Sequence, residues 1–137
     1  MHKLLDKKEA QVTRFVTLKN VDTGTEDYCF DDSDVVDMKH RDFYFMEIGK
    51  KYDCKILLFG HAVPGHGNVA KKVLCHVVRD NVIRGSGRHV EVKVGEDRYY
   101  VPRCDVEDQL KNGEFYYYYT RKDLVQVDNV IHGKYLD

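Results

Sequence analysis

The stretch that decides the fold is HVEVKVGEDRYYV, residues 89–101. Its first half alternates strictly, so that the valines face one side while Glu91 and Lys93 face the other. Strict alternation over this length predicts a half-buried β-strand. The next residues, Gly95–Asp97, predict a tight hairpin turn into a second strand over residues 98–101. This hairpin indicates that the chain belongs to a β class.

The same period of two recurs along most of the chain and predicts seven or eight short strands, with no long helix. Residues 105–111 are expected to form one or two helical turns, and Gly60–Asn68 a mobile loop. Short strands hide their edges best in a small closed or partly open barrel, with a β-sandwich as the alternative. We therefore expect an all-β, OB-like barrel. The expected strands cover residues 10–21, 26–30, 52–59, 71–79, 89–94, 98–101, 114–120 and 124–131.

The length of 137 residues is enough to bury about two thirds of the unfolded surface, so we expect one domain over residues 1–137. No apolar run approaches the ~18 residues of a membrane-spanning helix. Charged residues in Met1–Glu9 occupy the place of a signal peptide's apolar stretch, and the four cysteines form no Cys-x-x-Cys pair. These features predict a cytoplasmic protein with free thiols. Cys54 and Cys75 alternate with apolar residues and are expected to be buried.

Residues 48–60, IGKKYDCKILLFG, resemble the opening strand of an S1-type OB-fold. In that family a glycine and a basic residue precede an alternating strand that ends near Phe-Gly. The resemblance covers about 13 of the 137 residues. It implies that a barrel face binds nucleic acid or another oligomer, and it identifies no binding residues by itself.

The net charge of −1 hides an uneven distribution, because residues 70–103 carry eight basic and four acidic side chains. Cations for phosphates and aromatic rings for bases are what a single-strand binding groove needs. We expect Arg84 and Arg88 to contact phosphates, and whichever of Tyr99 and Tyr100 points outward to stack on bases. The alternative is an ordinary solvated face. The predicted nucleic-acid site consists of Lys71, Lys72, Arg84, Arg88, Arg98, Tyr99, Tyr100 and Arg103.

A second candidate surface is acidic and aromatic. Residues 20–37 carry seven acidic and no basic side chains, which could present carboxylates to a basic protein surface or form a solvated loop. Residues 115–119, FYYYY, place alternate rings on opposite faces of an expected strand. Either a second layer covers both faces, or some tyrosines face solvent and anchor a partner. The predicted protein-interaction residues are Asp31, Asp32, Asp34, Tyr116 and Tyr118.

Catalytic and metal-binding patterns are weak. His61 and His66 share one loop, but no third ligand is identifiable, so neither a metal nor another cofactor is expected. The sequence contains no nucleophile elbow, phosphate-binding loop or His-Glu-x-x-His motif. We therefore expect a non-enzymatic binding module whose partner is single-stranded nucleic acid or RNA. The alternative is a protein-interaction or inhibitor protein, a type that phages and mobile elements carry as accessory proteins; the oligomeric state does not follow from the sequence.

Overall fold

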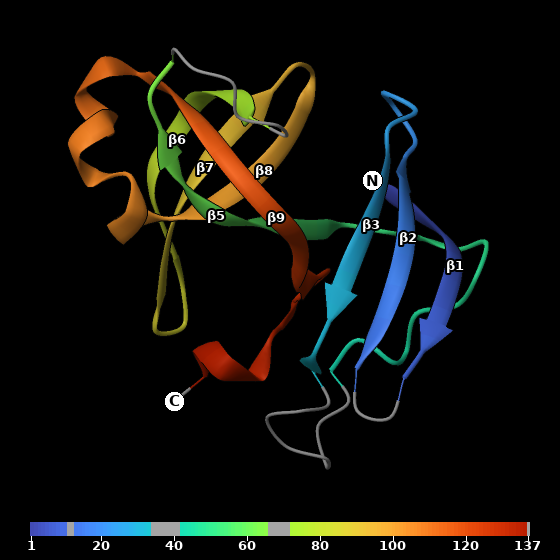
Figure 1. Cartoon of the computed structure of the whole chain (residues 1–137). Helices are drawn as coiled ribbons and strands as arrows, with labels where there is room; N and C mark the ends of the chain where they lie inside the picture. The colour runs from blue at the N-terminus through green and yellow to red at the C-terminus, as the bar shows by residue number, and fades with distance from the viewer. Residues whose placement is uncertain (11–12, 34–41, 66–71, 137) are drawn as a thin grey trace.

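The computed structural model describes residues 1–10, 13–33, 42–65 and 72–136. Strands dominate the fold (Figure 1), which confirms the predicted all-β class. Among the described residues, no helix has the length and apolar character needed to cross a membrane. The strands are β1 (His2–Glu9), β2 (Arg14–Asn20), β3 (Glu26–Asp31), β4 (Lys51–Tyr52), β5 (Cys54–Val63), β6 (Lys72–Arg84), β7 (Gly87–Val94), β8 (Asp97–Pro102), β9 (Glu114–Val127) and β10 (Val130–Ile131). Short 3₁₀ helices lie at Arg103–Asp105, Glu107–Asn112 and Gly133–Tyr135.

Five strands close into a barrel, as predicted, and this barrel is compatible with an OB-like fold. Around the ring the order is β9, β5, β8, β7, β6 and again β9. The contact between β5 and β8 is a single parallel pair, Leu57 opposite Tyr100, and the other contacts are antiparallel. The hairpin of residues 89–101 lies here as β7 and β8, and its Val90 and Val92 are fully buried.

The strands β1 to β4 form an arm sheet that stands beside the barrel (Figure 1). Within it the order is β4, β1, β2, β3, and β3 then pairs with β9 in parallel, with Cys29 opposite Lys122. Strand β1 was not predicted, because charged residues interrupt its apolar pattern. It forms because Leu4 is fully buried while the strand pairs with β2 along its whole length.

Strand β9 joins the barrel to the arm sheet, since it pairs with β3, β5, β6 and β10. Its register with β5 shifts at two points, between Lys55 and Ile56 and between Phe59 and Gly60; at the second, Phe59 lies opposite Arg121 but Gly60 lies opposite Tyr119. A Cβ atom on Gly60 would lie 1.8 Å from the carbonyl oxygen of Tyr118. The two strands can therefore approach at this bulge only because residue 60 has no side chain.

Two of the sequence-based assignments are wrong in this region. The predicted loop Gly60–Asn68 begins too early, because β5 continues through its first four residues, as far as Val63, and pairs with β9 there; residues 66–68 lie outside the described part. The predicted strands 114–120 and 124–131 are mostly one continuous strand, β9. Charged side chains from Arg121 to Asp123 suggested a break, but neighbouring strands supply hydrogen-bond partners on both sides there.

One hydrophobic cluster extends from the barrel into the arm sheet. It includes Leu58 and Tyr117 of the barrel together with Val16 and Leu18 of β2. Cys54 and Cys75 are buried in the same cluster, as predicted, along with Cys29. The arm sheet thus buries its apolar face against the barrel side of the molecule rather than standing free.

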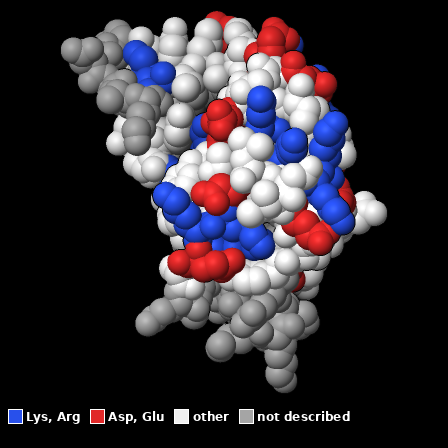
Figure 2. All heavy atoms as spheres, turned by 90° about the vertical axis from the view of Figure 1, so that its right-hand side faces the viewer, with Lys and Arg blue, Asp and Glu red and all other residues white. Residues whose placement is uncertain are grey.

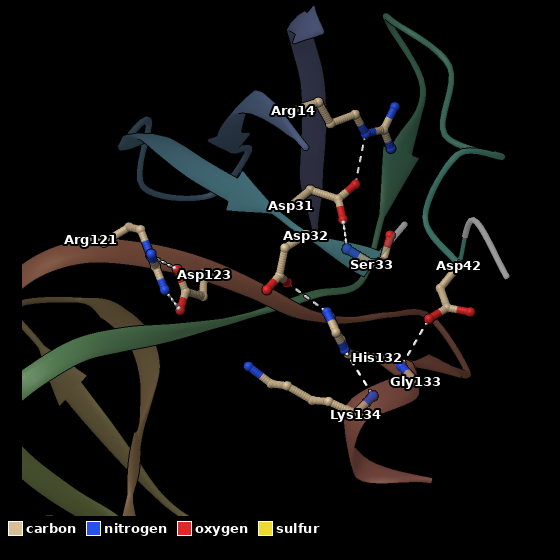
Figure 3. Close-up of polar contacts among 10 residues, drawn as sticks. All are labelled: Arg14, Asp31, Asp32, Ser33, Asp42, Arg121, Asp123, His132, Gly133 and Lys134. Carbon is tan, nitrogen blue, oxygen red and sulfur yellow. Dashed lines mark hydrogen bonds and ion pairs between the residues drawn. The ribbon is translucent and has the colours of Figure 1, made fainter. Parts of the chain in front are cut away.

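A buried ion pair fixes the far end of the arm sheet (Figure 3). The Arg14 Nε of β2 donates to the Asp31 carboxylate of β3 over 2.7 Å, and both side chains are almost fully buried. Arg14 also donates to the carbonyl oxygen of Phe43, and Asp31 accepts from the backbone N–H of Ser33. These bonds compensate the cost of removing two charges from water.

Replacing Gly60 with alanine is expected to lower the free energy of unfolding by about 1–3 kcal/mol or more, because the added methyl group would overlap backbone atoms of β9. Urea denaturation measures the change. The control is Gly65→Ala, whose new Cβ would meet only ring carbons of Tyr116, which can rotate aside. A Gly60→Ala protein as stable as Gly65→Ala would contradict the strand bulge.

Removing one partner of the buried ion pair, by Arg14→Met or Asp31→Leu, should cost about 3–5 kcal/mol of unfolding free energy, because a charge then stays buried alone. The double variant should cost clearly less than the sum of the two. Thermal and urea denaturation of the single and double variants form a complete cycle. Additive losses would show that the two side chains act independently.

Candidate functional site

The most distinctive surface is an aromatic face formed by Phe15, Tyr28, Phe30, Phe59 and Arg121. Phe15 lies on β2, and Tyr28 and Phe30 lie on β3, at positions that alternate with buried residues. The rings of Phe15 and Tyr28 stack with centroids 4.7 Å apart and an interplanar angle of 5°. The Phe15 ring also packs against the Phe30 ring, with centroids 5.2 Å apart. Tyr28 and Phe59 are each about half exposed, so this face presents rings to solvent.

Arg121 is held in place at the edge of this face. Its guanidinium lies over the rings of Phe30 and Phe59, at 4.5 and 4.6 Å from their centroids. Two hydrogen bonds join it to the carboxylate of buried Asp123 (Figure 3), and they raise the pKa of Arg121. Ring contacts and carboxylate together keep the arginine in one conformation.

A groove of about 350 Å³ runs along the junction of the arm sheet and β9. Its walls are Phe15, Glu26 and Tyr28 on one side and Tyr119, Arg121 and Lys122 on the other. An adjoining apolar pocket of about 220 Å³ shares Tyr119 and Lys122 with the groove and is lined further by Leu58, Val73, Val94 and Tyr99. We call the groove and this neighbouring pocket together the depression.

Lys122 does not carry a free charge into this depression. Its ammonium group hydrogen-bonds to the carboxylate of Asp27, which is buried on β3. The hydroxyl of Tyr99 donates to the same carboxylate over 2.9 Å. Part of the acidic segment, residues 20–37, thus holds β9 and β8 against β3.

The two tyrosines of the predicted nucleic-acid site are both buried, so neither can stack on bases as predicted. Tyr99 and Tyr100 are 5% and 3% exposed. The hydroxyl of Tyr99 bonds to Asp27 of the arm sheet. The Arg84 guanidinium lies over the Tyr100 ring, 4.5 Å from the ring centroid. The alternation of side chains along the strand predicted that one of the two rings points outward, but residues of other strands cover both faces of β8.

The prediction that Arg84 contacts phosphates is also wrong, because this residue is only 3% exposed and cannot reach a phosphate. Its guanidinium donates to the Gln126 side chain over 2.7 Å and lies 3.0 Å from the His89 Nδ1. The turn that follows it is occupied, because the Ser86 N–H donates to the carbonyl oxygen of Tyr135. The C-terminal segment thus covers the glycine-rich turn.

The other predicted basic residues are dispersed or neutralised. Arg98 and its neighbour Arg79 both bind the carboxylate of Glu91. Arg103 bonds to the carbonyl oxygen of Asp80 and lies 3.5 Å from Glu107. Three members remain: Arg88 is exposed, Lys72 lies over the Tyr116 ring, and Lys71 is outside the described residues.

The predicted acidic surface is only partly a surface. Asp31 is buried with Arg14 and is therefore not an exposed contact residue, and Asp34 lies outside the described part. Asp32 is partly exposed, and a hydrogen bond from His132 lowers the pKa of its carboxyl group. The other ring nitrogen of His132 accepts the backbone N–H of Lys134 (Figure 3). This fully buried histidine thus pins the C-terminal segment to the end of β3.

Tyr116 and Tyr118 are half-buried on one face of β9, while Phe115 and Tyr117 are buried on the other. The predicted alternation of rings is therefore confirmed. Tyr116 contacts Lys72, and the Tyr118 ring lies 5.5 Å from that of His61. Tyr116 lines a different groove, with Pro64 and Gln109, from the one beside the aromatic face.

Several histidine and cysteine side chains are buried or hydrogen-bonded. Both ring nitrogens of His132 are engaged in hydrogen bonds, one with Asp32 and the other with the backbone N–H of Lys134. Burial raises the pKa of the Cys54 and Cys75 thiols to about 12. His61 is exposed, His66 lies outside the described residues, and within the described ranges no three His, Cys, Asp or Glu side chains gather as a metal requires.

Sequence analysis did not single out the aromatic face, although part of its signal is visible. Tyr28 and Phe30 occupy alternate positions of a predicted strand, on the side opposite Cys29. That pattern places two rings on one face, but it does not reveal that Phe15, Phe59 and Arg121 join them. Residues 15, 28, 59 and 121 come together only through the pairing of β2, β3, β9 and β5.

Figure 2 shows the side of the molecule that faces right in Figure 1. Basic and acidic side chains are interspersed there and form no large area of a single sign. Such a mixed surface gives little long-range attraction for a polyanion. This face therefore offers no basic site for nucleic acid beyond the predicted one, whose residues lie apart or in ion pairs.

His89 makes stability depend on pH. Burial and then the Arg84 cation lower the pKa of His89 to about 4, from 6.5. Between these values only the unfolded chain binds this proton, so the free energy of unfolding should fall on acidification from about pH 6.5, by up to ~1.4 kcal/mol per pH unit. Urea denaturation from pH 7 to 5 should show a shallower dependence for His89→Gln than for wild type. The control is exposed His61→Gln; equal slopes in all three proteins would refute this assignment.

Comparison of the chain with protein-family models, curated proteins and solved structures finds no match in any of the three. The aromatic face offers exposed rings, an arginine fixed between two of them, and a groove beside an apolar pocket.

Proposed function

We propose that this protein is a non-enzymatic, cytosolic binding module that holds a protein partner on the aromatic face. The observation that carries the proposal is the position of Arg121, fixed between Phe30 and Phe59 beside the half-exposed ring of Tyr28. Aromatic and arginine side chains dominate the binding energy of protein interfaces. Here they are collected from four strands onto one surface.

The rigidity of this surface supports the same function. Each long side chain that becomes ordered on binding costs about 0.5–1.5 kcal/mol, and this cost reduces affinity. Arg121 is already ordered by Asp123, and Phe15 is already packed between Tyr28 and Phe30. A partner would therefore meet contacts that are formed in advance.

The charges favour a protein over a polyanion. Binding of nucleic acid draws much of its free energy from cations that neutralise phosphates. In β6 to β8, Arg79 and Arg98 share Glu91, and Arg84 is buried. At the junction, Lys122 is neutralised by Asp27. Ion pairing and burial thus weaken the electrostatic attraction for phosphates that the sequence predicts for this region.

Single-stranded nucleic acid is the second candidate, and one observation favours it. Lys8 lies opposite Phe15 in the register of β1 and β2, and Lys19 continues the same face of β2. Bases could stack on Tyr28 while these lysines contact phosphates. The resemblance of residues 48–60 to an S1-type OB-fold points to the same ligand.

Selection from a displayed library of random twelve-residue peptides tests the proposal. Peptides selected on the wild-type protein should bind Tyr28→Ala or Phe59→Ala at least about 30-fold more weakly, as expected when a hot-spot side chain is removed. Phe45→Ala is the matched control, because Phe45 is 45% exposed against 49% for Phe59 and lies outside the aromatic face.

Labelled oligo(dT) and oligo(U) are titrated against the same wild-type and variant proteins. Selected peptides that bind all three variants equally would refute the aromatic face as the binding surface. An oligonucleotide that binds more tightly than any peptide, and loses affinity in Tyr28→Ala but not in Phe45→Ala, would replace the protein-binding proposal with the nucleic-acid alternative.

A further inference from the structure

The groove beside the aromatic face carries an inference about the chemistry of the partner, and it rests on the proposed function. The groove has rings on both walls, Tyr28 from β3 and Tyr119 from β9. Tyr28 uses one ring face to stack on Phe15 and is half exposed. A flat group that enters the groove can therefore lie against the remaining face of Tyr28.

The unneutralised charge in this depression is negative. Lys122 is bound to Asp27 and Arg121 to Asp123, so these cations bring their own counter-charges. Glu26 is exposed at the groove wall and forms no ion pair with any described residue, although Lys19 is its register partner across the strands. The groove thus offers a carboxylate next to an aromatic ring.

A second carboxylate without an ion pair among the described residues lines the apolar pocket. Asp97 lines that pocket, and its oxygens accept hydrogen bonds from the hydroxyls of Thr23 and Thr25. The donors that it contacts are uncharged, including the side-chain amide of Asn20 at 3.4 Å. Asp97 therefore has no cationic partner within the described residues, and it lines a pocket together with Leu58, Val73 and Val94.

We propose that the groove binds a basic, extended segment of a partner protein, with an arginine against Tyr28 and Glu26 and an apolar side chain in the adjoining pocket. A guanidinium over a tyrosine ring gains about 0.5–2 kcal/mol, and a nearby carboxylate adds a charge-assisted hydrogen bond. Asp97 attracts a further cation of the segment. The sign of both carboxylates disfavours a polyanion at the same place.

Fluorescence anisotropy with designed peptides tests this assignment. The probe is a labelled ten-residue peptide in which arginine and leucine alternate. Matched peptides carry glutamate in place of every arginine, or serine in place of every leucine. The arginine–leucine peptide should bind at least tenfold more tightly than either, and added salt should weaken it.

Variants of the groove locate the contact. Glu26→Gln and Tyr28→Leu should each weaken the arginine–leucine peptide about 3- to 30-fold, in line with the loss of a charge-assisted bond or a cation–π contact. Asp108→Asn is the matched control, because Asp108 is an exposed carboxylate on the 3₁₀ helix outside the groove. Each variant must retain wild-type unfolding behaviour, which thermal denaturation reports.

Two results would overturn the inference: stronger binding of the glutamate peptide, or unchanged binding in both Glu26→Gln and Tyr28→Leu. If library-selected peptides without basic residues still need Tyr28 and Phe59, the basic segment is refuted while the protein-binding function stands. If no selected or designed peptide depends on Tyr28 or Phe59, both proposals fail together.

Discussion

The rest of the structure depends on the pairing of one strand, β9, with four others. Its first half closes the barrel between β5 and β6, and its second half holds β3 of the arm sheet in parallel. A strand can serve both sheets only if it bends between them. One of its two register shifts with β5 lies opposite Gly60, where a side chain would collide with backbone atoms of β9, and a bulge of this kind bends a strand.

The bulge also decides where the candidate site lies. Residues 121 and 122 follow it directly, so Arg121 meets the exposed Phe59 while Lys122 points to Asp27 in the interior. Their different roles follow from opposite faces of one strand. Arg121 thus reaches the aromatic face, and Lys122 the interior, from adjacent positions of β9.

Acidic residues act mainly as anchors in this protein. Asp27, Asp31, Glu91 and Asp123 are all buried, and each binds a basic side chain from another strand or from its own strand. Burial of such a pair costs free energy, because both charges lose their water. In return, the hydrogen bonds hold the two side chains in a defined geometry. They also explain why a chain that is one third charged shows so few free cations beside its exposed rings.

The sequence by itself determined the β class, the hairpin at residues 89–101 and the buried setting of Cys54 and Cys75, because a period of two is a local property of each strand. It could not determine which strand faces are covered. Tyr99 and Tyr100 alternate as expected, yet Asp27 of the arm sheet covers one and Arg84 covers the other. Likewise Phe15, Tyr28, Phe59 and Arg121 lie far apart along the chain, and only the pairing of β2, β3, β9 and β5 brings them onto one surface. Contacts of this kind join residues distant in sequence, so tertiary structure alone decides them.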